Sequence, residues 1–210
     1  MKKFGILVLQ PIKMDFSKEY TKEQFYWGTE PHKAVTHLLN FIKSGEALDL
    51  GIGEGKNAIF LAKNGFNIEG VDCSIDGLEK VEKLAQINGV SVKTFCADIN
   101  EFKFIKKYDL IISTFTLHYL PKIKAYEVIR KIKDSTKKGG FNLIMVFTRN
   151  FPGYSLGMEK KFDLDLFEKN ELNNLYLDWE VIKYSEEIKL DKSHGKPHYH
   201  SIALLIARKI

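Results

Sequence analysis

Short apolar runs alternate with helix-like segments through the middle of the chain. The apolar runs cover residues 47–50, 67–71, 91–95, 108–113 and 141–147. Between them, residues 56–64, 75–88 and 123–136 carry apolar side chains at helical spacing. Such an alternation is typical of a parallel sheet with helices on both faces. We therefore predict an α/β fold of the Rossmann-like type.

The flanking segments complete a single predicted domain, residues 1–210. Residues 31–42 predict a helix with Pro31 in its first turn, and another helix is expected near 167–177. Two extended segments, 179–188 and 199–208, are joined by a polar turn and predict a hairpin. The two strands of a hairpin run in opposite directions, and we expect the last strand to be antiparallel to the rest of the sheet. Residues 1–30 are expected to form an extension that covers a bound ligand.

Composition narrows the class of protein. The chain is 44% hydrophobic and 28% charged, as in globular domains, and no apolar run approaches the roughly 18 residues of a membrane span. We expect a cytoplasmic protein. The net charge of +5 comes almost entirely from scattered lysines, whereas nucleic-acid surfaces favour arginine. Cys73 and Cys96 fall at strand ends that we expect to be buried, and we predict that both are reduced.

A glycine-rich turn, LDLGIGEGKNA at 48–58, gives the strongest functional signal. Its glycines let the chain turn sharply and let a ligand approach the main chain. Lys56 stands where a dinucleotide-binding fingerprint requires its last glycine. Asp49 and Glu54 add negative charge at a place that would otherwise suit a pyrophosphate. The turn therefore predicts a ligand with ammonium and sulfonium groups, which describes S-adenosylmethionine.

Two further carboxylates follow the next strands. Asp72, 21 residues after Gly51, could accept hydrogen bonds from ribose hydroxyls, and Asp98 could accept one from an adenine amino group beside the Ile99 main chain. Each could equally cap a helix, but carboxylates at successive strand ends favour a ligand site. Trp27 could stack on adenine or contact the sulfonium, or it could pack on the sheet edge.

The chain resembles class I S-adenosylmethionine-dependent methyltransferases, and within them the tellurite-resistance (TehB-like) family. The similar stretches are 48–66, 108–120, 136–147 and 203–209. The resemblance implies a seven-stranded, mostly parallel sheet with an antiparallel last strand. It also implies cofactor contacts at Gly51, Gly53, Asn57, Asp72, Asp98 and Ile99. Trp27, Asp49, Cys73 and Thr114 complete the predicted cofactor set.

Histidines mark the expected methyl-acceptor side. His118 follows the fourth strand, where it could orient the acceptor, take its proton, or simply pack in the loop. We predict acceptor contacts at Arg149, His194, His198 and His200, with a solvated turn as the alternative. No carboxylate or cysteine accompanies these histidines at ligand spacing, so we predict no metal.

The hairpin departs from the family pattern. Lys189, Leu190 and Pro197 stand roughly where the family carries His and Arg. The acceptor therefore stays open between a chalcogen oxyanion (tellurite or selenite), a thiol and another small nucleophile.

Methyl transfer from a sulfonium requires proximity, alignment and exclusion of water, so the lack of a catalytic triad motif agrees with it. One alternative is an RNA or other macromolecule methyltransferase. Against it, residues 113–115 lack the Asn/Asp-Pro-Pro-aromatic turn of amino-methylating DNA enzymes, and the chain has no Pro-Cys pair. A non-catalytic or NAD-type Rossmann binder is the other alternative, and Lys56 with the acidic turn argues against NAD.

Overall fold

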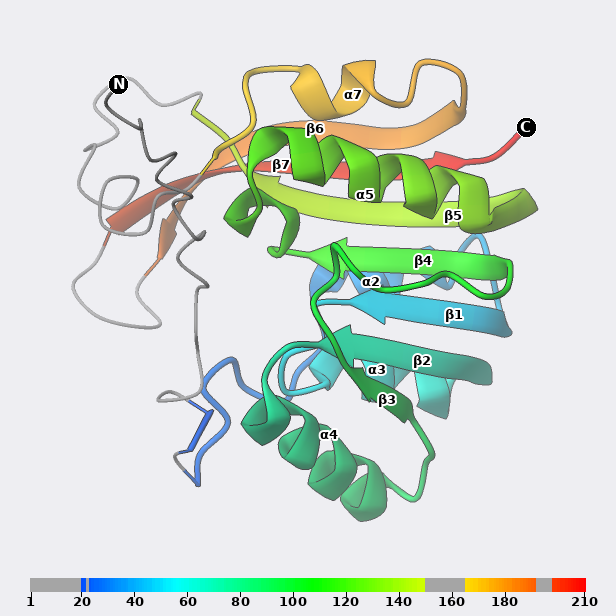
Figure 1. The fold of residues 1–210 in the computed structure, drawn as a ribbon, viewed down its shortest axis with the longest axis vertical. Helices are drawn as coiled ribbons and strands as arrows, with labels where there is room; N and C mark the ends of the chain where they lie inside the picture. The colour runs from blue at the N-terminus through cyan, green and yellow to red at the C-terminus, as the bar shows by residue number, and fades with distance from the viewer. Residues whose placement is uncertain (1–19, 22, 150–164, 192–197) are drawn as a thin grey trace, which may run out of the picture.

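A seven-stranded sheet forms the centre of the molecule, in the order β3-β2-β1-β4-β5-β7-β6 (Figure 1). The computed structural model describes residues 20–21, 23–149, 165–191 and 198–210. The strands are β1 (Gly45–Leu50), β2 (Phe66–Asp72), β3 (Lys93–Cys96), β4 (Tyr108–Thr114), β5 (Thr136–Phe147), β6 (Glu180–Asp191) and β7 (His198–Arg208). Strands β1 to β5 pair in parallel, and β7 is antiparallel to both β5 and β6. The predicted sheet with an antiparallel last strand is confirmed.

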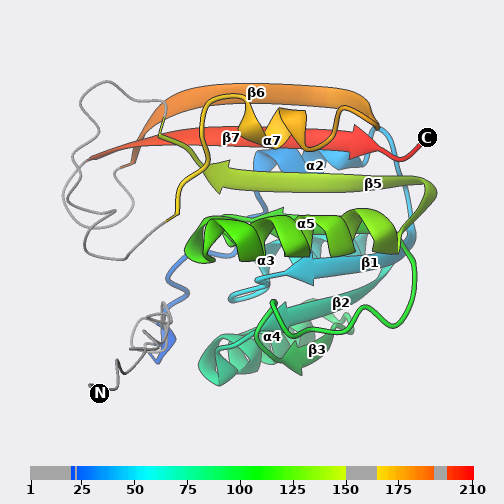
Figure 2. The ribbon, with the colours of Figure 1, turned by 45° about the horizontal axis from the view of Figure 1, so that its top comes forward.

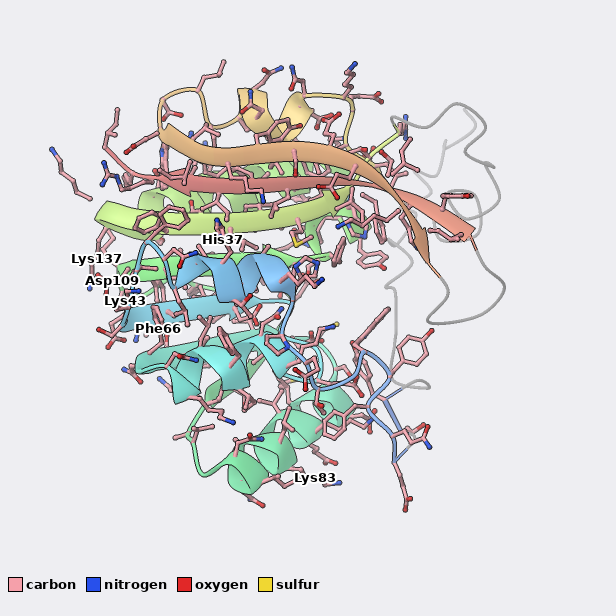
Figure 3. All side chains as sticks on the ribbon, turned by 180° about the vertical axis from the view of Figure 1, so that it is seen from behind. His37, Lys43, Phe66, Lys83, Asp109 and Lys137 are labelled. Carbon is pink, nitrogen blue, oxygen red and sulfur yellow. The ribbon has the colours of Figure 1, made fainter. Side chains whose placement is uncertain are left out.

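Helices cover both faces of this sheet, as predicted. One face carries α2 (Lys33–Leu38), α3 (Lys56–Lys63) and α4 (Ile75–Asn88), which Figure 3 shows in front of the strands. The other face carries the 3-10 helix η1 (Leu117–Tyr119), α5 (Lys122–Ser135) and α7 (Glu171–Asn174) (Figure 2). A large hydrophobic core lies on each side of the sheet, and a smaller one lies between α3 and α4. No helix in the described residues is long and apolar enough to cross a membrane.

Side-chain capping explains where α2 and α4 begin. Ser74 Oγ accepts a hydrogen bond from the Gly77 N–H at 3.2 Å and caps α4. His32 caps α2, because its Nδ1 accepts from the Ala34 N–H at 3.1 Å while its own backbone stays extended. Pro31 therefore precedes the helix and does not lie in its first turn, contrary to the prediction.

Two other boundaries differ from the predictions. The segment near 167–177 is helical only over α7, after which turns bury Tyr176 and Trp179. Apolar spacing alone does not separate a helix from a series of buried turns. Strand β5 begins at Thr136, which pairs with Tyr108, so residues 139–140 lie at an irregularity inside the strand.

The carboxyl ends of the parallel strands meet at one edge of the sheet. The register pairs Leu50 with Val71 and Asp72 with Cys96, which brings the ends of β1, β2 and β3 together. In Figure 1 their arrowheads point toward the blue segment that precedes α2. Asp109 and Lys137 form an ion pair of 2.8 Å at the opposite edge, where Figure 3 labels them. Ligands of open α/β sheets bind at the carboxyl edge.

Candidate active site

The turn after β1 has a backbone that requires glycine. Gly51 and Gly55 have φ angles of +77° and +88°. A Cβ on Gly51 would lie 2.1 Å from Thr116 Oγ1, and one on Gly55 would lie 2.9 Å from Val81 Cγ2. A side chain on Gly51 would therefore clash with the loop after β4, and a side chain on Gly55 would clash with α4. The turn holds the N-terminus of α3 close against the end of β1.

Asp49 lies buried directly before this turn. Asp49 is 1% exposed, and its Oδ1 has no hydrogen-bond partner within the described part of the chain. Burial, together with the charge of nearby Asp72, raises the pKa of Asp49 to about 8. A buried oxygen without a partner is costly, and a cationic group of a ligand would satisfy it.

Asp72 is held at the lip of the turn by main-chain donors. Its Oδ2 accepts a hydrogen bond from the Gly53 N–H at 2.9 Å, and its Oδ1 accepts one from the Ser74 N–H at 3.0 Å. Burial raises the pKa of this carboxyl, and the backbone hydrogen bonds oppose that effect. Asp72 and the glycine turn therefore form one fixed unit.

Asp98 caps the turn that follows it, which agrees in part with the capping alternative. Its Oδ1 accepts from the Asn100 N–H at 2.9 Å, and its carbonyl accepts from the N–H groups of Glu101 and Phe102. Ile99 is 7% exposed and packs into the core on the α5 side. The adenine contacts predicted for Asp98 and the Ile99 main chain stay predictions.

Asn57 and Thr114 bond to each other. Asn57 Nδ2 donates to Thr114 Oγ1 at 3.1 Å, while Asn57 Oδ1 accepts from the His32 N–H at 2.9 Å. Asn57 is 4% exposed, so its amide ties α3 to the end of β4 and to the start of α2. The structure thus gives both residues a positioning role that the sequence did not indicate, and their cofactor contacts stay predictions.

Glu54 does not offer its charge to a ligand, contrary to the prediction. Its Oε1 accepts hydrogen bonds from Lys80 Nζ at 2.7 Å and from the Tyr26 N–H at 3.0 Å, and its Oε2 accepts from the Trp27 N–H at 2.8 Å. Lys56 Nζ donates to the Trp27 carbonyl at 2.9 Å. Glu54, which is 2% exposed, therefore neutralises Lys80 and anchors the segment before α2 beside the glycine turn.

Tyr20 is a site residue that sequence reasoning missed. Its hydroxyl accepts a hydrogen bond from Trp27 Nε1 at 3.0 Å, and a Cβ on Gly53 would lie 3.2 Å from it. Burial, and then the charge of Asp72, raises the pKa of Tyr20. A tyrosine 33 positions before Gly53 gives no local signal of this contact. Trp27 lies in the segment beside the turn, as predicted, and the lid role of that segment stays a prediction.

Both cysteines are exposed, so their predicted burial is wrong. Cys96 ends β3, a short strand of four residues at the edge of the sheet, and Cys73 lies in a bend after β2. Cys73 nevertheless lies next to Asp72, at the predicted cofactor site.

His118 is fully buried in η1, and its tautomer follows from one hydrogen bond. Nδ1 accepts from the Phe147 N–H at 3.3 Å. A ring nitrogen that accepts carries no hydrogen, so the neutral imidazole has its proton on Nε2. Burial, and then His200, lowers the pKa of His118 to about 3. Nε2 has no hydrogen-bond partner among the described residues, and it is therefore a buried donor at neutral pH.

Phe147 lies between two imidazoles. Its ring centroid is 4.4 Å from that of His118 and 4.4 Å from that of His200, which is stacked at 8°. His200 is 5% exposed and lies opposite Lys189 near the start of β7. The prediction that this strand begins at the edge where the parallel strands end is confirmed, because Ile202 pairs with Phe147 at the end of β5.

The other predicted acceptor contacts are placed only in part. The backbone of His198 pairs with Asp191, and its side chain lies outside the described residues, as does all of His194. Arg149 is exposed, and its Nη1 lies 3.4 Å from Glu168 Oε1. The described residues contain no cluster of three or more His, Cys, Asp or Glu that could hold a metal.

Phe115 and His32 also lie on the predicted acceptor side, and the sequence did not indicate either of them. Phe115 has a φ of +58°, an unusual backbone for a bulky residue and one that is often found at functional sites. Its ring lies 5.1 Å from that of Phe147 and 6.0 Å from that of His32. Burial, and then Lys189, lowers the pKa of His32 to about 4. The predicted acceptor side is therefore aromatic, and the low pKa values of His118 and His32 keep these two imidazoles neutral at pH 7.

The sequence model of the family described as "Tellurite resistance protein TehB" matches residues 14–198. The chain belongs to this family. The predicted family is thereby confirmed, and the glycine turn, Asp72 and the β6–β7 hairpin described above are features of a TehB family chain.

Individual relatives agree with this assignment. A "Probable S-adenosyl-L-methionine-dependent methyltransferase TehB" of Haemophilus influenzae is 27% identical over 197 residues, which cover 92% of this chain and 65% of the relative. "Hemagglutinin 1" of Eikenella corrodens is 29% identical over 184 residues, covering 86% of this chain and 60% of the relative. The chain thus spans 60% to 65% of the length of these curated relatives.

Solved structures show the same fold. The crystal structure of TehB from Haemophilus influenzae gives a TM-score of 0.73 at 25% identity, covering 93% of this chain and 66% of that one. Magnesium protoporphyrin IX methyltransferase from Synechocystis with bound S-adenosylmethionine gives 0.62 at 16% identity, covering 84% and 76%. The second likeness concerns the fold alone. The predicted class I methyltransferase fold is confirmed.

Proposed function

We propose that the chain transfers the methyl group of S-adenosylmethionine to a small nucleophile. The observation that carries this proposal is the buried Oδ1 of Asp49, which has no hydrogen-bond partner among the described residues. It lies beside a glycine turn, and the strand after that turn ends in Asp72. Membership of the TehB family supports it. The cofactor would supply a methyl group that is already activated on a sulfonium, so the chain needs to bind, align and exclude water.

The cofactor side divides into three parts. Asp49 would accept a hydrogen bond from the ammonium group, and Asp72 would accept hydrogen bonds from the ribose hydroxyls. Asp98 and the main chain of Ile99 would contact the adenine. The glycine turn would let the ligand lie against main-chain atoms. The remaining proposed contacts are Trp27, Gly51, Gly53, Asn57, Cys73 and Thr114.

On the acceptor side, His118 would act as a hydrogen-bond donor and not as a base. Its Nε2 carries the proton because Nδ1 accepts from Phe147, and its low pKa keeps the ring neutral. A buried N–H suits an acceptor that arrives ionised, such as a chalcogen oxyanion or a thiolate, and such an acceptor needs no base. We propose that Arg149, His194, His198 and His200 contact the same acceptor.

Calorimetry tests the cofactor part of the proposal. S-adenosylmethionine should bind and NAD should not, Asp72→Ala should weaken binding at least tenfold, and the exposed Glu79→Ala on α4 should not. Binding of NAD in preference would refute the proposal. Methyl transfer should then be screened with tellurite, selenite, small thiols and tRNA; transfer to tRNA alone would refute a small acceptor.

A further inference from the structure

The two cysteines of the chain lie side by side at the rim of the proposed cofactor site. Cys96, the last residue of β3, is the register partner of Asp72, and Cys73 follows Asp72 directly. Cys96 Sγ lies 3.7 Å from the carbonyl oxygen of Cys73. Both side chains are exposed, so oxidants can reach them.

Their spacing suits a disulfide. Neighbouring strands lie about 4.8 Å apart with a rise of about 3.3 Å per residue, so residues offset by one position have Cα atoms about 6 Å apart. Disulfides join Cα atoms that are about 4.4 to 6.8 Å apart. Cys73 lies just beyond the last paired residue of β2, so the strand ladder does not fix the direction of its side chain.

We propose that Cys73 and Cys96 are a redox-sensitive pair whose reversible disulfide blocks the ribose and adenine part of the cofactor site. The pair flanks both carboxylates of that part, because Cys73 follows Asp72 and Asp98 lies two residues after Cys96. The Ala97 N–H donates to the Asp72 carbonyl at 2.9 Å, which fixes the two strand ends to each other. The blocking effect rests on the proposed function, whereas the disulfide itself does not.

The oxidant is a hydroperoxide, and the electrons balance in two steps. One thiolate attacks the peroxide oxygen, becomes a sulfenic acid and releases water or an alcohol. The second thiolate attacks that sulfur, the S–S bond forms, and the sulfenic oxygen leaves as water. The two thiols lose two electrons to the peroxide in total, and a dithiol reductant returns them.

Mass spectrometry and calorimetry on the full chain test the proposal. After limited hydrogen peroxide, the wild type should lose the mass of two hydrogen atoms and yield a peptide pair joined through Cys73 and Cys96. Its affinity for S-adenosylmethionine should fall at least tenfold and return after a dithiol. Bound S-adenosylmethionine should slow formation of the cross-link.

Cys96→Ser is the matched control. It should bind the cofactor as the reduced wild type does, form no cross-link and keep its affinity after peroxide. Separate oxidation of each cysteine in the wild type, or a cross-link that leaves affinity unchanged, overturns the proposal. A reduced wild type that binds no S-adenosylmethionine contradicts the proposed function and the blocking role together, and the mass measurement separates that outcome from failure of the disulfide.

Discussion

The main-chain N–H of Phe147 donates a hydrogen bond to Nδ1 of His118 at 3.3 Å. This bond ties the end of β5 to the loop after β4, and it decides the form of the imidazole. Because Nδ1 accepts, the hydrogen of neutral His118 is on Nε2. A residue that the sequence left open between base, orienting group and packing is therefore a buried donor.

Replacing His118 with Leu should lower kcat/KM about 10- to 150-fold, because a hydrogen bond to a charged group contributes roughly 1.5 to 3 kcal/mol. His118→Gln, which can still present an N–H, should recover part of that loss. Steady-state kinetics with the acceptor from the screen measure both variants, and calorimetry should show unchanged cofactor affinity. Equal activity of His118→Leu and the wild type would make the histidine a packing residue.

Acid should destabilise the folded chain through the same histidine. The folded pKa of about 3 lies below the ordinary 6.5, so the unfolded chain binds a proton that the folded chain does not. The contribution of neutral His118 to the free energy of unfolding is then fully present above about pH 6.5, and it falls as the pH drops toward 3. Urea unfolding at pH 4.5 and 7 should show a smaller loss for His118→Leu than for the wild type. The same loss in both would contradict the buried neutral form.

Glu54→Gln should destabilise the fold by about 3 to 5 kcal/mol, because it leaves the buried Lys80 without its charge partner. Chemical denaturation measures the change, and the fluorescence of Trp27 should report loosening of the segment before α2. Glu127→Gln is the control, since its ion pair with Lys124 is exposed and contributes little. A loss no larger than that of the control would show that Glu54 does not anchor the segment.

The sheet and the glycine turn could be predicted because both depend on local patterns. Apolar runs mark the strands, and positive φ angles at Gly51 and Gly55 require the residue type that the sequence displays. The role of Glu54 could not be predicted, because its partner Lys80 lies 26 residues away and faces it only after α3 and α4 pack together. A charge read from the sequence is available to a ligand only if no such partner neutralises it.

The sequence predicted which edge of the sheet carries the proposed acceptor residues, but it did not predict their chemistry. An antiparallel last strand must begin at the edge where the parallel strands end, which brings His200 toward His118. The tautomer of His118 depends on a main-chain donor 29 residues away, and the ring of Phe115 packs against that of Phe147, which is distant in the sequence. Neither contact can be recognised from the neighbouring residues in the sequence.

Gly51→Ala should abolish cofactor binding or unfold the turn, because the new Cβ would lie 2.1 Å from Thr116 Oγ1. Gly139→Ala is the matched control: its φ is similar at +79°, but apart from its chain neighbours no described residue has an atom within 4 Å of the added Cβ. Gly139→Ala should lose only about 1 to 2 kcal/mol from backbone strain. Thermal unfolding and calorimetry compare the two. Equal effects would assign the whole cost to φ and none to the close contact.

Binding of S-adenosylmethionine should release a proton from Asp49. Burial raises its pKa to about 8 in the free chain, so it is mostly protonated at pH 7, and an ammonium group beside it favours the ionised form. Affinity should therefore rise with pH up to about 8 and then level off. Calorimetry at pH 7 in buffers of different ionisation enthalpy should detect about one released proton. Asp49→Asn should bind more weakly and lose this dependence, whereas the exposed Asp134→Asn should keep it. Binding without proton release by the wild type would exclude Asp49 as the ammonium partner.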